Sequence, residues 1–361
     1  MTTLTQLHLE GVRNLVSTDL TPGKGINLIT GENGAGKSSL LEAIHILSTG
    51  RSFRTSHIRN VIQHNQEQLL VSGSVAGQES QIPLGVEKSI QKTRARLNRK
   101  PVKRISELTK ALPLVLLHPS SYTLLTGEPA KRRAYLDWGA FHSNPEFHEH
   151  WRGYRRVLEQ RNAAIRKQST RIDIELWNEQ LAHFGTFVHQ SRSEYLQAIN
   201  EIIPDIHAKL GFDYEVNCEY RPGWNQETSL LEALQQSIDR DQQLKYTYAG
   251  PHRADLLVKL DGYKVDSIAS RGQLKLTTLL LLLSQAAYYQ RHSGSACILL
   301  LDDLPSEFDH YHLEKIITVV QNSGAQCFIT TIEPDAIPDS GAVETTMFHV
   351  EHGNIKNSPQ S

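Results

Sequence analysis

Apolar residues in the first hundred positions of the chain recur at the short spacing of β-strands. The run Leu4, Leu7 and Leu9 alternates loosely with polar residues and predicts a strand. Three later segments predict strands that are antiparallel neighbours: 69–75, 82–86 and 94–97. A short apolar run at 114–117 predicts a buried strand.

Long helical segments begin near Pro119. From residue 130 to about 203, apolar residues recur at helical spacing within a polar sequence that contains few turn signals. We predict a helical insertion that folds back as a helix pair or a short antiparallel bundle. A strand at 212–220 and a helix at 229–244 follow.

Strands and helices alternate in the last third of the chain, which indicates a return to the first domain. The expected elements are a strand at 256–260, a helix at 273–291, a strand at 296–301, a helix at 311–322, a strand at 326–331 and a small hairpin around 351–354. We therefore predict an α/β domain formed by 1–118 and 246–361, interrupted by an inserted helical domain at 119–245.

The composition is that of an ordinary globular protein. The chain has 361 residues, of which 39% are hydrophobic and 21% charged, and its net charge is −1. A charge near zero argues against a protein that coats nucleic acid with its whole surface, but it leaves room for local basic faces.

Cysteine usage and apolar runs bear on the location of the protein. Cys297 and Cys327 lie in apolar runs, far from Cys218 and from each other, and are expected to be buried thiols in a reducing cytosol. The N-terminus lacks the charged and apolar regions of a signal peptide. The longest strongly apolar run, 279–283, is too short to span a bilayer. We expect a cytoplasmic protein that is not embedded in a membrane.

The strongest chemical signal is a phosphate-binding loop. An apolar strand, 26–30, precedes it, and Leu40, Leu41, Ile44 and Leu47 follow it at helical spacing. The loop matches the pattern Gly, four residues, Gly-Lys-Ser at every fixed position. Its residues are Gly31, Glu32, Asn33, Gly34, Ala35, Gly36, Lys37 and Ser38, followed by Ser39.

These residue types suit a nucleoside triphosphate. Glycines let main-chain N–H groups point inward at phosphate oxygens, and the start of the following helix adds its positive end. Lys37 can reach the β- and γ-phosphates, and the hydroxyl of Ser38 can bind Mg²⁺. The sequence thus predicts ATP and Mg²⁺ as cofactors. A glycine-rich turn that fits by chance is the alternative, and the flanking strand and helix argue against it.

A second apolar strand ends in two carboxylates, Asp302 and Asp303. A phosphate-loop ATPase holds Mg²⁺ with an Asp at the carboxyl end of a neighbouring strand, and we expect Asp302 in that role. Asp303 then stands where a general base could take a proton from the attacking water. Without the phosphate loop, two solvated acids at a strand end would be the competing interpretation.

A short polar segment, Ser270-Arg271-Gly272-Gln273, precedes the long apolar helix. A hydroxyl, close main-chain N–H groups and a helix start form an anion-binding arrangement. Taken alone, the segment is more simply an ordinary N-cap followed by a glycine. Its position between the phosphate loop and the acidic strand end favours a functional role.

The order of these motifs resembles that of ABC-type ATPases: phosphate loop, insertion, Ser-x-Gly-Gln signature, acidic strand end, and then Ser306-Glu307-Phe308-Asp309. This resemblance implies that Ser270, Gly272 and Gln273 contact the γ-phosphate held by a second copy of the chain. ATP would then join two copies, and hydrolysis would release them.

Further segments resemble the RecF family of bacterial recombination and gap-repair ATPases, which is related to the heads of SMC proteins. Besides the three motifs above, they are 50–54 (GRSFR), 127–138 (GEPAKRRAYLDW) and 248–253 (YAGPHR). The resemblance covers nearly the whole chain. It implies an ABC-type P-loop ATPase head with an antiparallel β subdomain and an inserted, mainly helical second domain.

The same resemblance implies an activity and partners. The chain would form an ATP-dependent homodimer that binds gapped or junction duplexes and single-stranded DNA, in DNA replication, in the repair of DNA damage and in the SOS response. RecO and RecR would act with it to load RecA onto gaps. We expect a weak, DNA-dependent ATPase.

Some positions depart from the wider ABC pattern. Asp303 stands where a Glu is usual, so the base is one methylene shorter. Thr330 and Thr331 stand where a His commonly contacts the γ-phosphate. The usual Gln of the linker to the helical region is not evident near His118-Pro119. These departures predict slow hydrolysis.

Two clusters of cations are candidates for contact with the phosphate backbone of DNA. The first is Lys92, Arg94, Arg96, Arg99, Lys100, Lys103 and Arg104, with no acid between Lys88 and Ile105. The second is Lys131, Arg132, Arg133, Arg152, Arg155, Arg156, Arg161, Arg166, Lys167 and Arg171. A solvated face is the alternative for each, and Arg132 and Arg133 are placed to pair with acids such as Asp137. The histidines form no metal-ligand cluster, so no zinc site is expected.

Two other functional classes remain as alternatives. An ATPase subunit of a transporter would dock on membrane helices, but the insertion is longer and more basic than such coupling needs. A chromosome-architecture protein of the SMC type needs arms of several hundred heptad residues, and this insertion is long enough only for a stub.

Overall fold

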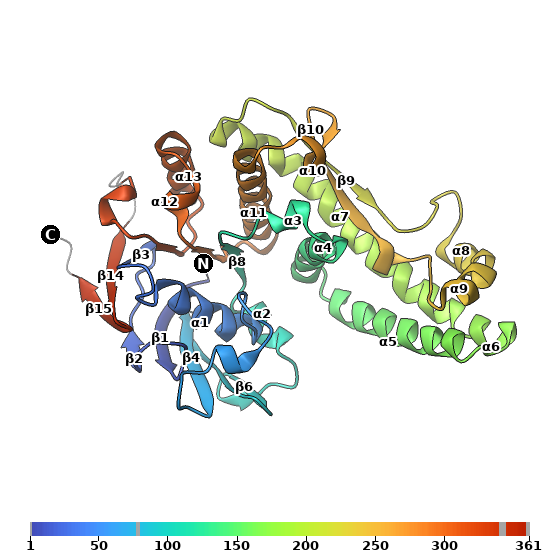
Figure 1. The fold of residues 1–361 in the computed structure, drawn as a ribbon, viewed down its shortest axis with the longest axis horizontal. Coiled ribbons are helices and arrows are strands. Elements are labelled where there is room, and N and C mark those ends of the chain that lie inside the picture. The colour runs from blue at the N-terminus through green and yellow to red at the C-terminus, as the bar shows by residue number, and fades with distance from the viewer. Residues whose placement is uncertain (1, 77–79, 339–343, 359–361) are drawn as a thin grey trace. The chain divides into compact units, whose positions relative to one another are not determined.

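The computed structural model describes residues 2–76, 80–338 and 344–358, which form two compact units (Figure 1). The first unit is drawn from Met1–Ser121, Asp205–Gly211 and Leu279–Ser361, and the second from Tyr122–Pro204 and Phe212–Thr278. The boundaries 1–118, 119–245 and 246–361 stay a prediction about separable domains.

A six-stranded sheet with the order β15-β14-β3-β13-β12-β8 forms the centre of the first unit. Its strands are β3 (Ile26–Thr30), β8 (Leu114–Leu117), β12 (Ile298–Leu301), β13 (Cys327–Thr330), β14 (Thr345–Glu351) and β15 (Asn354–Ser358). All neighbours are parallel except β14 and β15, which form an antiparallel hairpin. Every residue of β3, β12 and β13 is buried, because parallel strands are covered on both faces.

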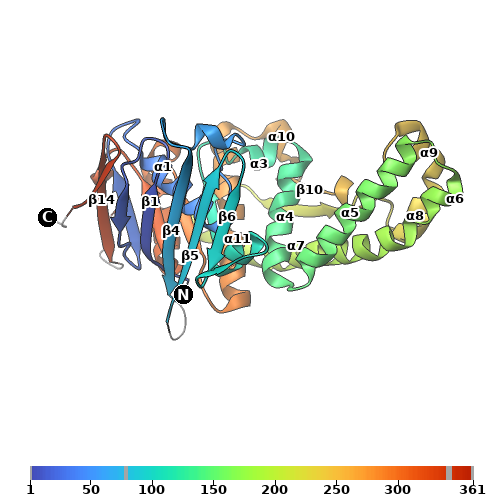
Figure 2. The same ribbon diagram turned by 90° about the horizontal axis from the view of Figure 1, so that it is seen from below.

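A second six-stranded sheet in this unit is antiparallel, with the order β2-β1-β4-β5-β6-β7 (Figure 2). Its strands are β1 (Leu4–Glu10), β2 (Thr18–Leu20), β4 (Gln68–Ala76), β5 (Gln81–Ser89), β6 (Thr93–Leu97) and β7 (Lys100–Pro101). The strands predicted at 69–75, 82–86 and 94–97 are thereby confirmed as β4, β5 and β6. Leu4, Leu7 and Leu9 are all buried on β1.

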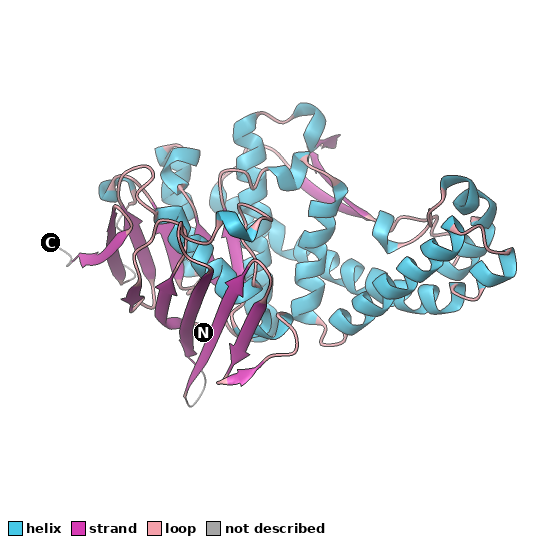
Figure 3. Cartoon of the chain, turned by 60° about the horizontal axis from the view of Figure 1, so that its bottom comes forward, coloured by secondary structure: helices cyan, strands magenta, loops and turns pink. Residues whose placement is uncertain are grey.

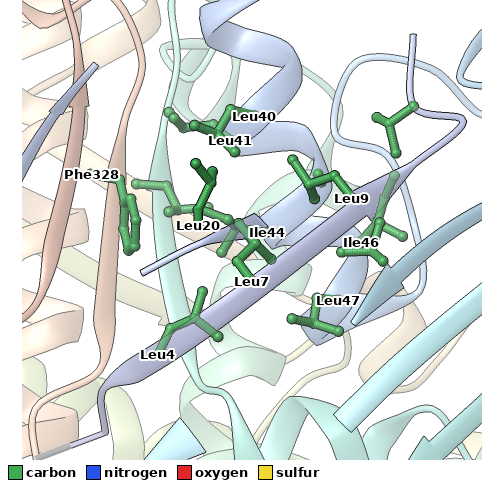
Figure 4. Packing of buried hydrophobic residues seen from close by; sticks show 14 of the residues in the cluster. Leu4, Leu7, Leu9, Leu20, Leu40, Leu41, Ile44, Ile46, Leu47 and Phe328 are labelled. Atoms are coloured by element: carbon green, nitrogen blue, oxygen red, sulfur yellow. The ribbon is translucent and has the colours of Figure 1, made fainter. Parts of the chain in front are cut away.

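Helix α1 (Lys37–Thr49) packs against both sheets and shares one apolar core with them. Leu40, Leu41, Ile44 and Leu47, which were predicted from their spacing, are at most 2% exposed. They lie with the leucines of β1 and with Phe328 of β13 (Figure 4). Truncation of a residue such as Ile44 to Ala in a core of this kind costs about 2–5 kcal/mol. The core therefore fixes the place where the phosphate loop passes into α1.

Shorter elements complete the first unit: η1 (Ile58–Asn60), α2 (Ser106–Ala111), α12 (Leu304–Glu307), α13 (His310–Asn322) and η3 (Pro334–Ala336). Helix α13 confirms the helix predicted at 311–322. The small hairpin predicted around 351–354 is part of a larger feature, because β14 pairs in parallel with β3 and so belongs to the central sheet. That pairing joins the two ends of the chain, which a local sequence pattern does not reveal.

The second unit is mainly helical (Figure 3). Its elements include α3 (Thr123–Thr126), α4 (Pro129–Ser143), α5 (Phe147–Arg166), α6 (Arg171–Glu175), α8 (Leu230–Gln236), α9 (Ile238–Leu244), η2 (Pro251–Arg253) and α10 (Val265–Ile268), with parts of α7 (Asn178–Leu210) and α11 (Arg271–Ser293). The predicted helix pair is confirmed as α5 and α7. They pack so closely that a Cβ on Gly153 would lie 2.6 Å from the ring of Phe184.

A small antiparallel sheet with the order β11-β10-β9 belongs to the second unit. Its strands are β9 (Val216–Arg221), β10 (Asp255–Leu260) and β11 (Tyr263–Lys264). The strand predicted at 212–220 thus begins only at Val216. The helix predicted at 229–244 is two helices, because the hydroxyl of Ser237 donates to the carbonyl of Leu234 and competes with the helical ladder. Of the helices that the structure describes, none combines the length and apolar character that a membrane crossing requires.

Candidate nucleotide site

The phosphate loop and the two acids lie at the same edge of the central sheet. The loop follows β3 and the acids follow β12, and β13 pairs in parallel with both strands. The carboxyl ends of parallel strands are where α/β proteins bind ligands. A cleft of about 540 Å³ opens there, lined by Arg13, Asn14, Asn33, Gly34, Gly36, Lys37, Ser38, Ser39, Arg54, Asn60, Ile62, His64, Pro119, Asp302, Asp303 and Thr330.

Glycine is required at two positions of the loop. Gly31 has φ 144°, and a Cβ there would lie 2.2 Å from the carbonyl oxygen of Val350. Gly36 has φ 125°, and a Cβ there would lie 2.7 Å from a methyl carbon of Leu15. Gly36 is also the N-cap of α1, and among the residues described no side chain caps the first N–H groups of that helix. These N–H groups are left to bind an anion.

The side chain of Lys37 folds back over the loop and is only 8% exposed. Its Nζ donates to the carbonyl oxygens of Gly31 at 2.7 Å and Glu32 at 3.0 Å. Burial lowers the pKa of Lys37, and the charges of Asp303 and Asp302 oppose that shift. The ammonium is therefore held inside the loop, next to the acids, where phosphate oxygens would compete for it.

Ser38 and Asp302 are in direct contact. The hydroxyl of Ser38 donates to Oδ1 of Asp302 at 2.8 Å, and the hydroxyl of Thr330 donates to the same oxygen at 2.8 Å. Burial raises the pKa of Asp302, although both hydrogen bonds act to lower it. A hydroxyl and a carboxylate are ligand types that Mg²⁺ accepts, so these residues fit that ion.

Asp303 has an unusual backbone conformation, with φ 57°, and is the N-cap of α12. Its N–H donates to Oγ1 of Thr330 at 2.7 Å, and its carboxylate accepts from the hydroxyl of Ser306. Thr330, which stands in the sequence where a His commonly contacts the γ-phosphate, thus bonds to both acids. Asp303 lines the cleft, and its role as general base stays a prediction.

Sequence reasoning missed the residues that support the loop from the side. Nδ2 of Asn14 donates to the carbonyl oxygens of Gly34 and Ala35, both at 3.1 Å, and Oδ1 of Asn14 accepts from Ser39 at 3.3 Å. These bonds hold the two carbonyls on the outer side of the phosphate loop, so the N–H groups of the loop are left to face the cleft.

A buried carboxylate on α1, Glu42, was also missed. Its side chain is fully buried and accepts two hydrogen bonds from Arg13, at 2.8 and 2.9 Å, and one from the hydroxyl of Ser52. Arg54 lies 3.9 Å from the same carboxylate. The segment 50–54 is thereby anchored to α1. The sequence did contain a signal for Glu42, because it is a charged residue within the apolar pattern that predicted the helix.

The Ser-x-Gly-Gln signature lies in the second unit, at the start of α11. Oγ of Ser270 accepts from the N–H of Gln273 at 3.2 Å, and Oε1 of Gln273 accepts from the N–H of Ser270 at 2.9 Å. This is a capping box, so the interpretation of Ser270 as an ordinary N-cap is correct. The nearest atom that a Cβ on Gly272 would meet among the described residues is Oγ of Ser270, at 3.9 Å. Packing within the chain does not explain this glycine.

The cations of the first basic cluster are all exposed, on β6, β7 and the adjoining turns. Arg94 pairs with Glu87 at 2.9 Å. Among the residues described, no ion pair involves Arg96, Arg99 or Lys100. Asn98 and Arg99, with φ 50° and 63°, form the tight turn that holds these side chains at the edge of the sheet.

The second basic cluster is partly internal, which corrects the prediction of a cationic face for three of its ten residues: Arg161 is buried, and Arg132 and Arg133 are half-buried. Arg161 is fully buried and donates to Asp241 at 2.6 Å, and Arg132 makes a two-point ion pair with Asp255 at 2.6 and 3.0 Å. Asp137 pairs with Arg192 at 2.7 Å and not with Arg132 or Arg133. The other seven cations are exposed and lie mainly along α5: Lys131, Arg152, Arg155, Arg156, Arg166, Lys167 and Arg171.

His252, from the segment 248–253, serves the interior of the second unit. Its ring bonds to the hydroxyl of Tyr154 at 2.6 Å and to the carbonyl of Thr247 at 2.9 Å. Burial lowers the pKa of His252 to about 4, so the ring is neutral at pH 7. Within the described part of the chain, no group of three or more His, Cys, Asp or Glu side chains is placed to hold a metal ion.

Comparison with known proteins agrees with this geometry. The family model for the RecF/RecN/SMC N-terminal domain matches residues 3–356. The DNA replication and repair protein RecF of Thioalkalivibrio sulfidiphilus is 40% identical over 355 residues, which are 98% of this chain and 99% of that protein. Its counterpart in Photorhabdus laumondii is 36% identical over 361 residues, 99% of each chain.

Solved structures extend the comparison to three dimensions. The recombination mediator protein RecF-ATP in the RecFOR pathway is similar with a TM-score of 0.89 and 25% identity, over 99% of this chain and 98% of that one. The Smc head domain of Pyrococcus furiosus has a TM-score of 0.61 at 16% identity, over 99% of this chain and 96% of that one, and shares the fold. The predicted class, an ABC-type ATPase head with an antiparallel β subdomain and a mainly helical part, is thus confirmed.

Proposed function

The chain belongs to the RecF family, within the RecF/RecN/SMC N-terminal domain group, and from this premise we propose that it is an ATP-dependent DNA-binding protein of DNA replication and recombinational gap repair. It is an ABC-type ATPase whose slow, DNA-dependent hydrolysis resets it. In this proposal the segments 1–118 and 246–361 form the ATPase head, and 119–245 is the inserted domain.

The contact between Ser38 and Asp302, at 2.8 Å, carries the nucleotide part of the proposal. It brings the end of the phosphate loop to the acidic end of β12, so one bound Mg²⁺ would have a hydroxyl and a carboxylate as ligands. The N–H groups of 31–39 and the ammonium of Lys37 would hold the β- and γ-phosphates, whose charge Mg²⁺ neutralises when bound. Asp303 is the proposed general base for the attacking water.

The open space at Gly272 supports a contact with a second copy of the chain. A glycine at the second position of a helix lets a phosphate approach the main chain closely. Because no packing within the chain requires it there, we assign Ser270, Gly272 and Gln273 to the γ-phosphate bound by a partner copy. ATP would then join two copies in a homodimer, as the family resemblance implies.

The unpaired cations of the first basic cluster support binding of the DNA backbone. Of the seven exposed Lys and Arg side chains within 92–104, Arg94 pairs with Glu87, while the nearby carboxylate of Glu107 accepts from the main-chain N–H groups of Lys103 and Arg104. Such a surface neutralises phosphates whatever the base sequence, so it suits gapped duplexes, junctions and single strands. RecR and RecO are the proposed protein partners in loading RecA, and the cytoplasm is the proposed location.

An ATPase subunit of a transport or chromosome-architecture complex is the alternative function. It predicts ATP hydrolysis that does not respond to DNA, or arms far longer than the α5 and α7 pair. Relatives that span nearly the whole chain carry the name DNA replication and repair protein RecF, which favours the first proposal.

Sedimentation velocity tests the proposal directly. The whole chain is run without nucleotide, with Mg-ADP and with Mg-ATP, each with a gapped and with a blunt duplex. We expect a dimer only with Mg-ATP, and a dimer that carries DNA. Lys37→Met should stay a monomer, while Lys24→Met, at an exposed position near the same sheet, should behave as wild type. A wild-type chain that remains single in saturating Mg-ATP with duplex present would overturn the proposal.

A further inference from the structure

Strand β9 has an open edge. Among the described strands it pairs only with β10, in an unbroken register from Val216 opposite Leu260 to Arg221 opposite Asp255. Nδ2 of Asn200 donates to the carbonyl oxygen of Cys218 at 3.0 Å, and the N–H of Asp261 beyond β10 donates to the carbonyl of Glu215 at 3.1 Å. Because main-chain groups alternate along a strand, the groups of Val216, Cys218 and Tyr220 point away from β10.

Some features that protect an edge strand are missing from β9, although Glu219 and Arg221 place charges on its exposed face and Asn200 of α7 bonds to the carbonyl of Cys218. Proteins protect such edges with a proline, a bulge or a charged side chain that points inward. No proline or register shift occurs within Val216–Arg221. Val216, Cys218 and Tyr220, on the more buried face, are uncharged, and Pro222 comes only after the strand ends. An edge left in this state is a template for another strand.

A groove of about 620 Å³ runs along this edge, between β9 and α7. It is lined by His189, Ser193, Leu196, Gln197, Asn200, Glu201, Cys218, Tyr220, Pro222 and Gln226. The α7 residues recur at three- and four-residue spacing, so they form one face of that helix. The groove therefore offers main-chain groups on one wall and hydroxyl, amide and carboxylate groups on the other.

The two ends of the groove differ in chemistry. Glu201 lies toward the Val216 end, since α7 runs antiparallel to β9 from His189 near Tyr220 to Asn200 near Cys218. At the other end the ring of His189 stacks on Tyr220 at 5.5 Å and meets Trp224 edge-on at 4.9 Å. Burial and the nearby charge of Arg192 lower the pKa of His189, so the ring of His189 is neutral at pH 7 and this end is aromatic. No Lys or Arg is among the lining residues.

We propose that a partner protein adds an extended segment to β9 as a fourth strand, seated in this groove. The segment pairs with the outward N–H groups of Val216, Cys218 and Tyr220 and with the carbonyls of Val216 and Tyr220, because the carbonyl of Cys218 already accepts from Asn200. This is recognition by β-strand addition. It carries a Lys or Arg opposite Glu201 and an apolar side chain at the aromatic end. A nucleic acid is disfavoured, because the groove has a carboxylate and no cation for phosphates. This surface goes beyond the proposed function, since it needs neither ATP nor DNA.

Fluorescence anisotropy tests the proposal with the whole chain. The probe is a labelled ten-residue peptide of alternating threonine and valine, with two lysines at one end. We expect saturable binding that weakens at least tenfold when glutamates replace the lysines or when every second amide is N-methylated. Gln197→Arg should weaken binding at least tenfold, while Gln180→Arg, the same change on an exposed part of α7 outside the groove, should not. Binding that is absent, or unaffected by N-methylation or by Gln197→Arg, overturns the proposal.

Amide hydrogen exchange tests the open edge without depending on the affinity of one peptide. In the free chain the amides of Cys218 and Tyr220 should exchange fast, and those of Asn217 and Glu219 slowly. The lysine peptide should slow the first pair and leave the second unchanged. Uniformly slow exchange along β9 would overturn the assignment. So would displacement of the peptide by an oligonucleotide, or a dimer formed through β9 that the peptide does not disrupt.

Discussion

The hydroxyl of Ser38 and Oδ1 of Asp302 are 2.8 Å apart, although the two residues are separated by 264 positions in the sequence. Asp302 is only 6% exposed, and burial raises its pKa above the ordinary value of a carboxyl group. A carboxyl group whose pKa is higher in the folded state than in the unfolded state favours folding when protonated. Ionised Asp302 therefore weakens the fold above its folded-state pKa, and this loss disappears as the pH falls below its unfolded-state value.

Asp302→Asn should increase stability while it abolishes hydrolysis. The amide keeps an oxygen that can accept from Ser38 and Thr330, but it removes the buried charge. We expect the free energy of unfolding at pH 7 to rise by about 1 kcal/mol, with a gain that shrinks as the pH falls and wild-type Asp302 becomes protonated. Urea unfolding at pH 7 and pH 4 measures the first effect, and Mg²⁺-dependent phosphate release measures the second. A variant less stable than wild type at pH 7 would contradict this account of the carboxylate.

Thr330→Val should move the acid limb of the ATPase profile to higher pH. The hydroxyl of Thr330 donates to Asp302, and this bond lowers the pKa of that carboxyl group. Without it Asp302 takes up a proton at higher pH and no longer serves as a Mg²⁺ ligand. The rate of Mg-ATP hydrolysis between pH 5 and pH 9 measures the shift. Thr331→Val is the control, since that hydroxyl donates to the carbonyl of Glu333 and should leave the profile in place.

The sequence predicted those elements whose pattern is local. Leu40, Leu41, Ile44 and Leu47 identified α1, and alternation identified β4, β5 and β6. Pairings between distant segments were not predicted, and β14 beside β3 is the clearest case. The order of strands depends on which apolar faces meet, and the pattern of a single strand does not contain that information.

The candidate site divides in the same way. Lys37, Ser38, Asp302 and Asp303 were named from motif order, and the structure brings them to one cleft. Asn14 and Glu42 were missed because each acts through partners that lie far along the chain. Arg161 was misplaced on a cationic face for a similar reason, since its acid partner, Asp241, lies 80 positions away.

Ser270→Arg should prevent ATP-dependent pairing without loss of ATP binding. The side chain at 270 is exposed at the start of α11, so a long cation there would block the approach of a second copy. Equilibrium binding of a fluorescent ATP analogue should change less than twofold, while sedimentation with Mg-ATP should show a monomer. Ser267→Arg, at an exposed position on α10, is the matched control and should still dimerise. If Ser270→Arg instead prevents nucleotide binding by the monomer, the signature acts within one chain.

Arg96→Glu combined with Arg99→Glu should weaken binding to duplex DNA of any sequence. Each cation that neutralises a phosphate contributes about 0.9 to the slope of log K against log salt, so the slope should fall by about two. Anisotropy titrations of a labelled duplex at several salt concentrations between about 50 and 200 mM measure this slope. Arg152→Glu combined with Arg156→Glu reverses the same charge on α5 and should change the slope far less. Equal losses in the two double variants would mean that net charge, and not this surface, determines binding.

Asp241→Ala should destabilise the second unit strongly. Arg161 and Asp241 are both fully buried, and the guanidinium of Arg161 also donates to Asn178 at 2.9 Å and Thr247 at 2.8 Å. Removal of the carboxylate leaves a buried cation without its counter-charge, which costs about 3–5 kcal/mol. Guanidinium unfolding followed by tryptophan fluorescence measures the cost. Asp239→Ala, on the same helix but 81% exposed, should cost less than about 1 kcal/mol, as surface pairs do. A similar small cost for Asp241→Ala would mean that water reaches Arg161 and replaces the lost partner.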